Sequence, residues 1–151
     1  MKDGLTTSYY TMALEIALKA HKGQKDRGGK EYIYHPIAVS DMCITSKGKI
    51  VALLHDVVED SDITIDDIKK VIPDDEILRA VLLLTKPKED FSYEEYLKKI
   101  RECPLACEVK LADLKHNSDL SRLKKVTEKD LLRKEKYEKS ILYLTGIVSS
   151  I

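Results

Sequence analysis

Apolar residues recur at intervals of three and four along most of the chain, as in Leu14, Ala17 and Leu18 and again in Ala52 and Leu53. This spacing is typical of one face of an α-helix, whereas the alternation typical of strands is rare. The pattern predicts an all-α protein of about eight helices. Because no repeat, low-complexity tract or linker interrupts it, we expect one compact unit.

Capping and helix-breaking residues set the expected boundaries. Thr64 and Ser92 are each followed three residues later by an acidic residue, as at helix N-termini. Gly23 and Pro87 follow apolar segments and are expected to end helices. The expected helices span 7–21, a short segment from 36, 49–59, 64–73, 74–84, 92–102, 104–123 and 127–148.

The composition restricts the classes of partner. With 151 residues, 43% of them hydrophobic, the chain can build one helical domain over 1–151. A net charge of zero provides no global field toward nucleic acid or an anionic membrane. No segment approaches the roughly 20 apolar residues of a membrane span, and the N-terminus does not resemble a secretory signal. We therefore expect a cytoplasmic protein without nucleic-acid or membrane partners. The sequence does not determine its oligomeric state.

Ionisable residues follow directly on an apolar run in the expected helix 49–59. His55 and Asp56 come after five apolar residues, and Glu59 and Asp60 follow four positions later. In a continuous helix His55 and Asp56 lie about 100° apart and can reach one ion. Because four such groups are costly to bury without partners, a compensating ion is one interpretation. A solvated helix end is the other, and it fits Glu59 and Asp60 better than His55.

A second polar pair lies on the expected helix 104–123. Asp113 and Asn117 are one turn apart, and the residues around them are largely apolar. A carboxylate in such surroundings is expected to face a compensating group. That group is either a metal ion or, in the simpler alternative, Lys110 or Lys115 in an ion pair.

Three segments together carry a resemblance to a known family. They are AHKGQKDRGGKEYIYHPIAV over 20–39, ALLHDVVEDSDIT over 52–64 and VKLADLKHN over 109–117. In this order they resemble the HD hydrolase domain of RelA/SpoT-type alarmone enzymes, most closely in size the stand-alone small alarmone hydrolases. The resemblance extends from about residue 5 to 145 and implies an all-α HD domain around a metal site.

The resemblance implies that one ion, usually manganese, is held by His35, His55, Asp56 and Asp113. Two imidazoles and two carboxylates also suit Mn²⁺ or Fe²⁺ on chemical grounds, and Zn²⁺ is a further possibility. Four protein ligands leave room on an octahedral ion for water and a phosphate oxygen.

Further roles follow from the same resemblance. Glu59 and Asp60 are expected to position or deprotonate the attacking water, and Asn117 to help hold the nucleotide. A carboxylate one turn from the metal ligands can be within reach of a proton on a metal-bound water. His21 and His116 are interpreted mainly as structural histidines at a helix end and on the surface.

The sequence indicates the substrate-binding residues less clearly than the metal ligands. Arg27, beside the glycines at 28 and 29, belongs to a basic loop that is suited to a phosphate or a base, with an ordinary solvated turn as the alternative. Tyr32 is expected either to contact the nucleotide or to pack. Lys86 and Lys110 are further candidates for the phosphates.

Two positions depart from the family pattern. Asp26 stands where many alarmone hydrolases carry a basic residue, and Leu114 follows the KLAD motif where a basic residue is common. These departures bear on which nucleotide is the substrate more than on whether the chain catalyses the hydrolysis.

The expected function is an enzyme, a manganese-dependent phosphohydrolase. It removes the 3′-pyrophosphate from guanosine tetraphosphate or pentaphosphate and gives GDP or GTP and pyrophosphate. Alternatives are an HD phosphohydrolase of another nucleotide, such as the 2′-phosphate of NADPH, and a metal-containing nucleotide-binding module with little turnover. Glu59 and Asp60 favour catalysis over binding alone.

Overall fold

A computed structural model describes residues 2–151, apart from the side chains of residues 2, 3, 5 and 6. These residues form nine α-helices and no β-sheet, which confirms the expected all-α class. The helices are α1 (Lys2–Ala20), α2 (Tyr34–Met42), α3 (Ser46–Leu54), α4 (Val57–Asp60), α5 (Ile65–Val71), α6 (Asp75–Leu84), α7 (Tyr93–Arg101), α8 (Pro104–Ser118) and α9 (Glu128–Leu144).

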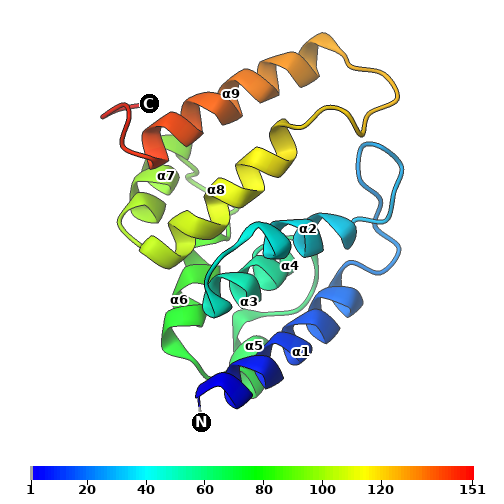
Figure 1. Ribbon diagram of the computed structural model, residues 1–151, viewed down its shortest axis with the longest axis vertical. Helices are drawn as coiled ribbons and strands as arrows, with labels where there is room; N and C mark the ends of the chain where they lie inside the picture. The colour runs from blue at the N-terminus through cyan, green and yellow to red at the C-terminus, as the bar shows by residue number, and fades with distance from the viewer. Residues whose placement is uncertain (1) are drawn as a thin grey trace.

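Helix α3 lies at the centre of the molecule. Every side chain from Ile50 to Leu54 is fully buried, because the second half of this helix is apolar on all sides and the helix packs against α1, α2, α6 and α8. Figure 1 shows α8 and α9 side by side at one edge, with α1 toward the opposite edge. The segment that connects α1 to α2 and the segment that connects α8 to α9 lie at the same end of the molecule (Figure 1). The site described below is at this end.

Side-chain caps begin the helices where the sequence predicts them. The Thr64 hydroxyl accepts the Asp67 N–H, and the Asp67 carboxylate accepts the Thr64 N–H, which makes a complete capping box. The same reciprocal arrangement joins Thr127 to Asp130 at the start of α9. Ser92 accepts the N–H of Glu95 at the start of α7.

The expected continuous helix over 49–59 is wrong. Helix α3 ends at Leu54, and the short helix α4 begins after Asp56, so His55 and Asp56 lie in the turn between them. The His55 Nδ1–H donates to the Ala52 carbonyl at 2.5 Å, and a side chain that takes a main-chain acceptor competes with the helix at that point.

Other boundaries also differ from expectation, among them the start of α2 at Tyr34 and the start of α3 at Ser46. Helix α1 begins before residue 7, α8 ends at Ser118 and α9 ends at Leu144. After Ser118 the Asp119 carboxylate accepts the Ser121 N–H in a turn. After Leu144, Gly146 adopts a φ of 80°, a left-handed conformation that closes a helix C-terminus and favours glycine.

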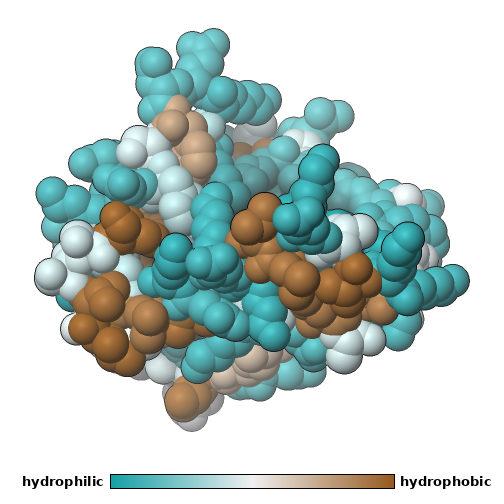
Figure 2. Space-filling model, turned by 90° about the horizontal axis from the view of Figure 1, so that it is seen from above, coloured by the Kyte–Doolittle hydropathy of each residue, from teal (hydrophilic) through white to brown (hydrophobic). Residues whose placement is uncertain are grey.

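Hydrophilic residues separate small hydrophobic groups on the face shown in Figure 2. Exposed large apolar side chains of the described chain include Leu131 and Leu132 of α9. Among the described helices we find none that is long and apolar enough to cross a membrane.

Leu53→Ala is expected to lower the free energy of unfolding by about 2–5 kcal/mol, because it empties a fully buried position in α3. Leu131→Ala, at a position that is 56% exposed, is the matched control and should change it by less than about 0.5 kcal/mol. Urea unfolding measures both values. Equal losses in the two variants would contradict the assignment of the core.

Candidate metal centre

Four side chains from three parts of the chain meet beside α3. His35 comes from the start of α2, His55 and Asp56 from the turn after α3, and Asp113 from α8. Possible ligand atoms of His35, His55 and Asp56 lie within 4.8 Å of one another. The Oδ1 atom of Asp113 lies 2.8 Å from His35 Nε2 and 3.4 Å from His55 Nε2. The structure thus brings together all four residues that the sequence predicts as ligands.

His55 presents one ring nitrogen to the carboxylates. Its Nδ1–H is bound to the Ala52 carbonyl, so in a neutral ring Nε2 carries the lone pair. This Nε2 atom is buried without a hydrogen bond, 3.0 Å from Asp56 Oδ2 and 3.4 Å from Asp113 Oδ1. A lone pair that faces two carboxylates is unfavourable unless a positive charge lies between them. The residues therefore fit a bound cation.

The same balance governs the pKa of His55 when no ion is bound. Burial alone favours the neutral ring, but Asp56 and Asp113 outweigh it and hold the pKa of His55 well above its usual value. A proton on His55 and a divalent cation are thus two ways to supply the positive charge that this site requires.

His116 fixes the orientation of His35. Their Nδ1 atoms are 2.7 Å apart, so one ring must donate and the other accept. Burial, with the neighbouring His35, lowers the pKa of His116 to about 4, which leaves this ring neutral and able to accept the proton of His35 Nδ1. Nε2 is then the nitrogen of His35 that faces Asp113 Oδ1, at 2.8 Å, and with an ion bound it would supply the lone pair that a metal ligand requires.

Both oxygens of Asp113 have polar partners. Its Oδ2 atom pairs with Lys110 Nζ at 3.1 Å, and its Oδ1 atom accepts a hydrogen bond from Asn117 Nδ2 at 3.1 Å. Burial alone would raise the pKa of Asp113, but Lys110 and the two histidines keep it well below its usual range. Lys110 is itself buried, with its Nζ 5.3 Å from the centre of the Tyr96 ring. The ion pair with Lys110, which the sequence left as an alternative, therefore exists beside the histidine contacts.

Glu59 and Asp60 lie on α4, one turn beyond the predicted ligands. Glu59 is half-buried and accepts a hydrogen bond from the backbone N–H of Lys86. Burial, together with the charge of Asp56, raises the pKa of the Glu59 carboxyl. Asp60 is exposed, and its main-chain carbonyl accepts the side-chain amide of Gln24 at 2.8 Å.

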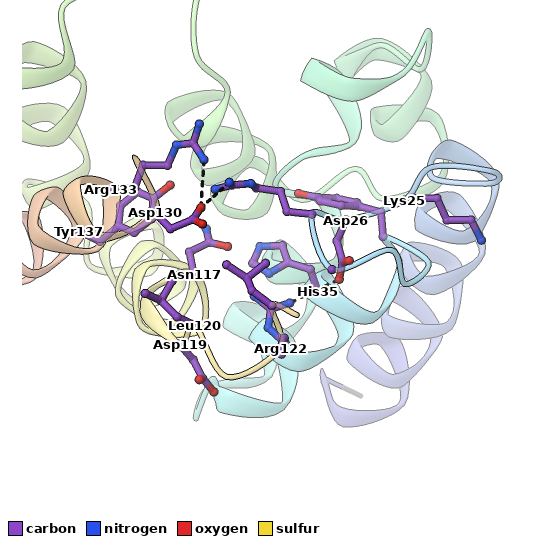
Figure 3. Close-up of a pocket in the computed structure, with 14 residues that line it drawn as sticks. Lys25, Asp26, His35, Asn117, Asp119, Leu120, Arg122, Asp130, Arg133 and Tyr137 are labelled. Atoms are coloured by element: carbon purple, nitrogen blue, oxygen red, sulfur yellow. Dashed lines mark ion pairs between the residues drawn. The ribbon is translucent and has the colours of Figure 1, made fainter. Parts of the chain in front are cut away.

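A pocket of about 350 Å³ opens beside His35 at this end of the molecule. Figure 3 shows the loop that carries Asp26 on one side and Asn117, Asp130 and Tyr137 on the other. The lining residues are Lys25, Asp26, Arg27, Gly28, Tyr32, His35, Asn117, Asp119, Leu120, Arg122, Leu123, Asp130, Arg133 and Tyr137. Arg27, Tyr32 and Asn117 thus line it as the sequence interpretation requires, whereas Lys86 and Lys110 do not.

Ion pairs join the two sides of this pocket. Arg27 contacts the buried carboxylate of Asp130, which also lies 3.7 Å from Arg133 Nη1 (Figure 3). Asp26 Oδ2 lies 3.6 Å from Arg122 Nη1, and Asp26 Oδ1 accepts the Lys30 N–H at 3.0 Å. Asp26 thus stabilises its own loop and forms an ion pair with Arg122. This structural role accounts for an aspartate where the family often has a basic residue.

Sequence reasoning missed the contribution of α9 to the pocket. In the sequence this segment shows only a helix with a polar face rich in Lys and Glu, and Asp130 stands three residues after Thr127, as in a helix cap. His21 is buried directly after the end of α1, as suits a structural histidine, whereas His116 is half-buried and contacts His35 instead of lying free on the surface. Leu114 lies in the hydrophobic core, so this second departure from the family pattern is a packing residue.

Comparison with known proteins gives several related sequences. A guanosine-3′,5′-bis(diphosphate) 3′-pyrophosphohydrolase of Borreliella burgdorferi is 39% identical over 89 residues, which are 56% of this chain and 13% of that protein. The bifunctional (p)ppGpp synthase/hydrolase SpoT of Escherichia coli is 33% identical over 117 residues, which are 68% of this chain and 16% of that protein. The chain therefore spans about one sixth or less of the length of these relatives.

Other relatives carry a different name. A GTP pyrophosphokinase of Streptomyces coelicolor is 28% identical over 138 residues, 84% of this chain and 15% of that protein. No protein-family model matches the chain.

The fold has a solved counterpart. The structure of a metazoan ortholog of SpoT that hydrolyses ppGpp superposes with a TM-score of 0.72 and 24% identity, over 91% of this chain and 85% of that one. Together with the related sequences, this similarity supports an HD domain of the ppGpp-hydrolase type. The resemblance found in the sequence is thereby confirmed.

The lowered pKa of His116 predicts a pH dependence of stability in the metal-free protein. The folded ring takes up its proton only near pH 4, whereas in the unfolded chain it does so near pH 6.5. Its contribution is therefore complete above about pH 6.5 and is lost as the pH falls toward 4. In chelator-treated protein, the free energy of unfolding of the His116→Asn variant should fall less steeply over this window than that of the wild type. Identical slopes would contradict the assignment.

Proposed function

We propose that this chain is a manganese-dependent hydrolase that removes the 3′-pyrophosphate of guanosine tetraphosphate or pentaphosphate. The products would be GDP or GTP and pyrophosphate. The observation that carries the proposal is the cluster of His35, His55, Asp56 and Asp113, in a chain similar to ppGpp 3′-pyrophosphohydrolases. We further propose that residues 1–151 act as one domain on a small nucleotide in the cytoplasm.

His35, His55, Asp56 and Asp113 would hold the ion. Two neutral imidazoles and two carboxylates balance a divalent charge and suit Mn²⁺ or Fe²⁺, and Zn²⁺ can also use such ligands. When bound, the ion would activate a water molecule and polarise the phosphate. The buried Nε2 atom of His55, which makes no hydrogen bond, supports this assignment.

Glu59 would accept the proton of the attacking water. Its half-buried position and the charge of Asp56 raise its pKa, which makes the carboxylate a stronger base near neutral pH. The hydrogen bond from the Lys86 N–H fixes the direction of the carboxylate. Asp60, the next residue along α4, would help to position the same water.

The nucleotide would occupy the pocket beside His35. Its volume of about 350 Å³ lies within the range of small-molecule sites. Arg27 would contact the phosphates and Asn117 the nucleotide, whereas Lys86 does not line this pocket. Lys110 is better suited to hold the charge on Asp113 than to reach the substrate, since it is buried and paired.

Asp56→Asn should reduce pyrophosphate release from guanosine tetraphosphate by at least about 100-fold, because loss of a ligand should cost at least as much as loss of a residue that only orients one. Asp66→Asn, an exposed position on α5, is the control and should retain full activity. The assay uses metal-stripped protein with Mn²⁺ restored, and a parallel reaction with NADPH. Phosphate release from NADPH without turnover of the guanosine substrate would contradict the assigned substrate.

Glu59→Gln should lower kcat by about 10²–10⁴-fold, because the amide cannot accept the proton. Its Mn²⁺ affinity should remain close to that of the wild type, since Glu59 is not among the proposed ligands. Calorimetric titration with Mn²⁺ and single-turnover kinetics separate the two effects. Parallel loss of metal binding would show that Glu59 belongs to the metal site instead.

A further inference from the structure

Asp56 occupies a position where the backbone does little to orient its side chain. It lies between α3 and α4 with φ of −106° and ψ of −2°, and its carboxylate makes no capping hydrogen bond to α4. A carboxylate that binds an ion from such a turn needs a hydrogen-bond donor elsewhere to fix its rotation.

Tyr32 provides that donor. Its hydroxyl donates to Asp56 Oδ2 across 24 positions of the sequence. The same oxygen lies 3.0 Å from His55 Nε2. The hydrogen bond therefore fixes the carboxylate relative to the histidine that would share an ion with it.

Tyr32 is itself held in place. Its backbone N–H donates to the Gln24 carbonyl at 2.9 Å, and its ring lies 4.9 Å from the ring of His21. His21 is buried and its Nδ1 atom lies 2.9 Å from Gln24 Oε1, while Gln24 Nε2 donates to the Asp60 carbonyl at 2.8 Å. The segment 21–32 thus contacts both ends of the segment 56–60, which gives the hydroxyl a defined position before any ligand binds.

We propose that Tyr32 is a positioning residue that acts through Asp56 and holds its carboxylate in the orientation that a divalent ion requires. The proposal rests on the metal site proposed above. It differs from the interpretation of Tyr32 as a nucleotide contact, which its place in the wall of the pocket also permits. The two roles can be separated, because phenylalanine keeps the ring and removes only the hydroxyl.

The test compares Tyr32→Phe with Tyr34→Phe by calorimetric titration with Mn²⁺ in the absence of nucleotide. Tyr34 is two residues away and 59% exposed, so the control loses the same hydroxyl without a buried partner. The Mn²⁺ dissociation constant should rise about 10–100-fold in Tyr32→Phe and change less than about twofold in Tyr34→Phe. Thermal unfolding of the metal-free proteins verifies that both variants are folded.

Activity measurements distinguish the two proposed roles. With saturating Mn²⁺, Tyr32→Phe should recover most of its kcat with an unchanged KM for guanosine tetraphosphate. An unchanged Mn²⁺ dissociation constant in folded Tyr32→Phe would overturn the inference, as would a raised KM without any metal effect. The expected loss of affinity in a protein that does not hydrolyse guanosine tetraphosphate would support the role of Tyr32 and reject only the substrate. A wild type that binds no Mn²⁺ would overturn both proposals.

Discussion

A buried carboxylate in the middle of α8 is the constraint on which the rest of the site depends. Asp113 cannot remain charged among helices without compensation, and Lys110 supplies one positive charge from the preceding turn. The Oδ1 atom still faces His35 and His55, where a proton or a cation must complete the balance. The ion pair with Lys110 therefore has two effects. It allows Asp113 to stay charged in the core, and a charged Asp113 is the form that can bind an ion.

The interruption between α3 and α4 also orients the predicted ligands. In a continuous helix, His55 and Asp56 would point about 100° apart, with their spread set by the helix alone. The turn instead lets the His55 ring bind the Ala52 carbonyl while Asp56 faces Tyr32. Each side chain is then oriented by a separate hydrogen bond, which preorganises the site beyond what helix geometry provides.

The pocket forms where the segment between α1 and α2 meets the segment between α8 and α9 and the start of α9. The loop with Asp26 and Arg27 lies against Arg122 and Asp130 through oppositely directed ion pairs. Asp26 therefore contributes to the shape of the pocket, although in the sequence it is only an unfavourable charge for a phosphate. The charges that a nucleotide would meet are supplied jointly by this loop and by α9.

The sequence by itself determined the all-α class and most helix starts, because these follow from local periodicity and short-range caps. Its resemblance to a known family predicted four ligands, which the structure brings close together. The sequence did not determine the break after Leu54, the burial of His21 or the contact of His116 with His35. Nor did it indicate that Asp130 would face Arg27, since the two are about a hundred positions apart. Only the tertiary structure decided these features, because a side chain's partner across the fold, unlike its place in a helix, depends on how distant segments pack.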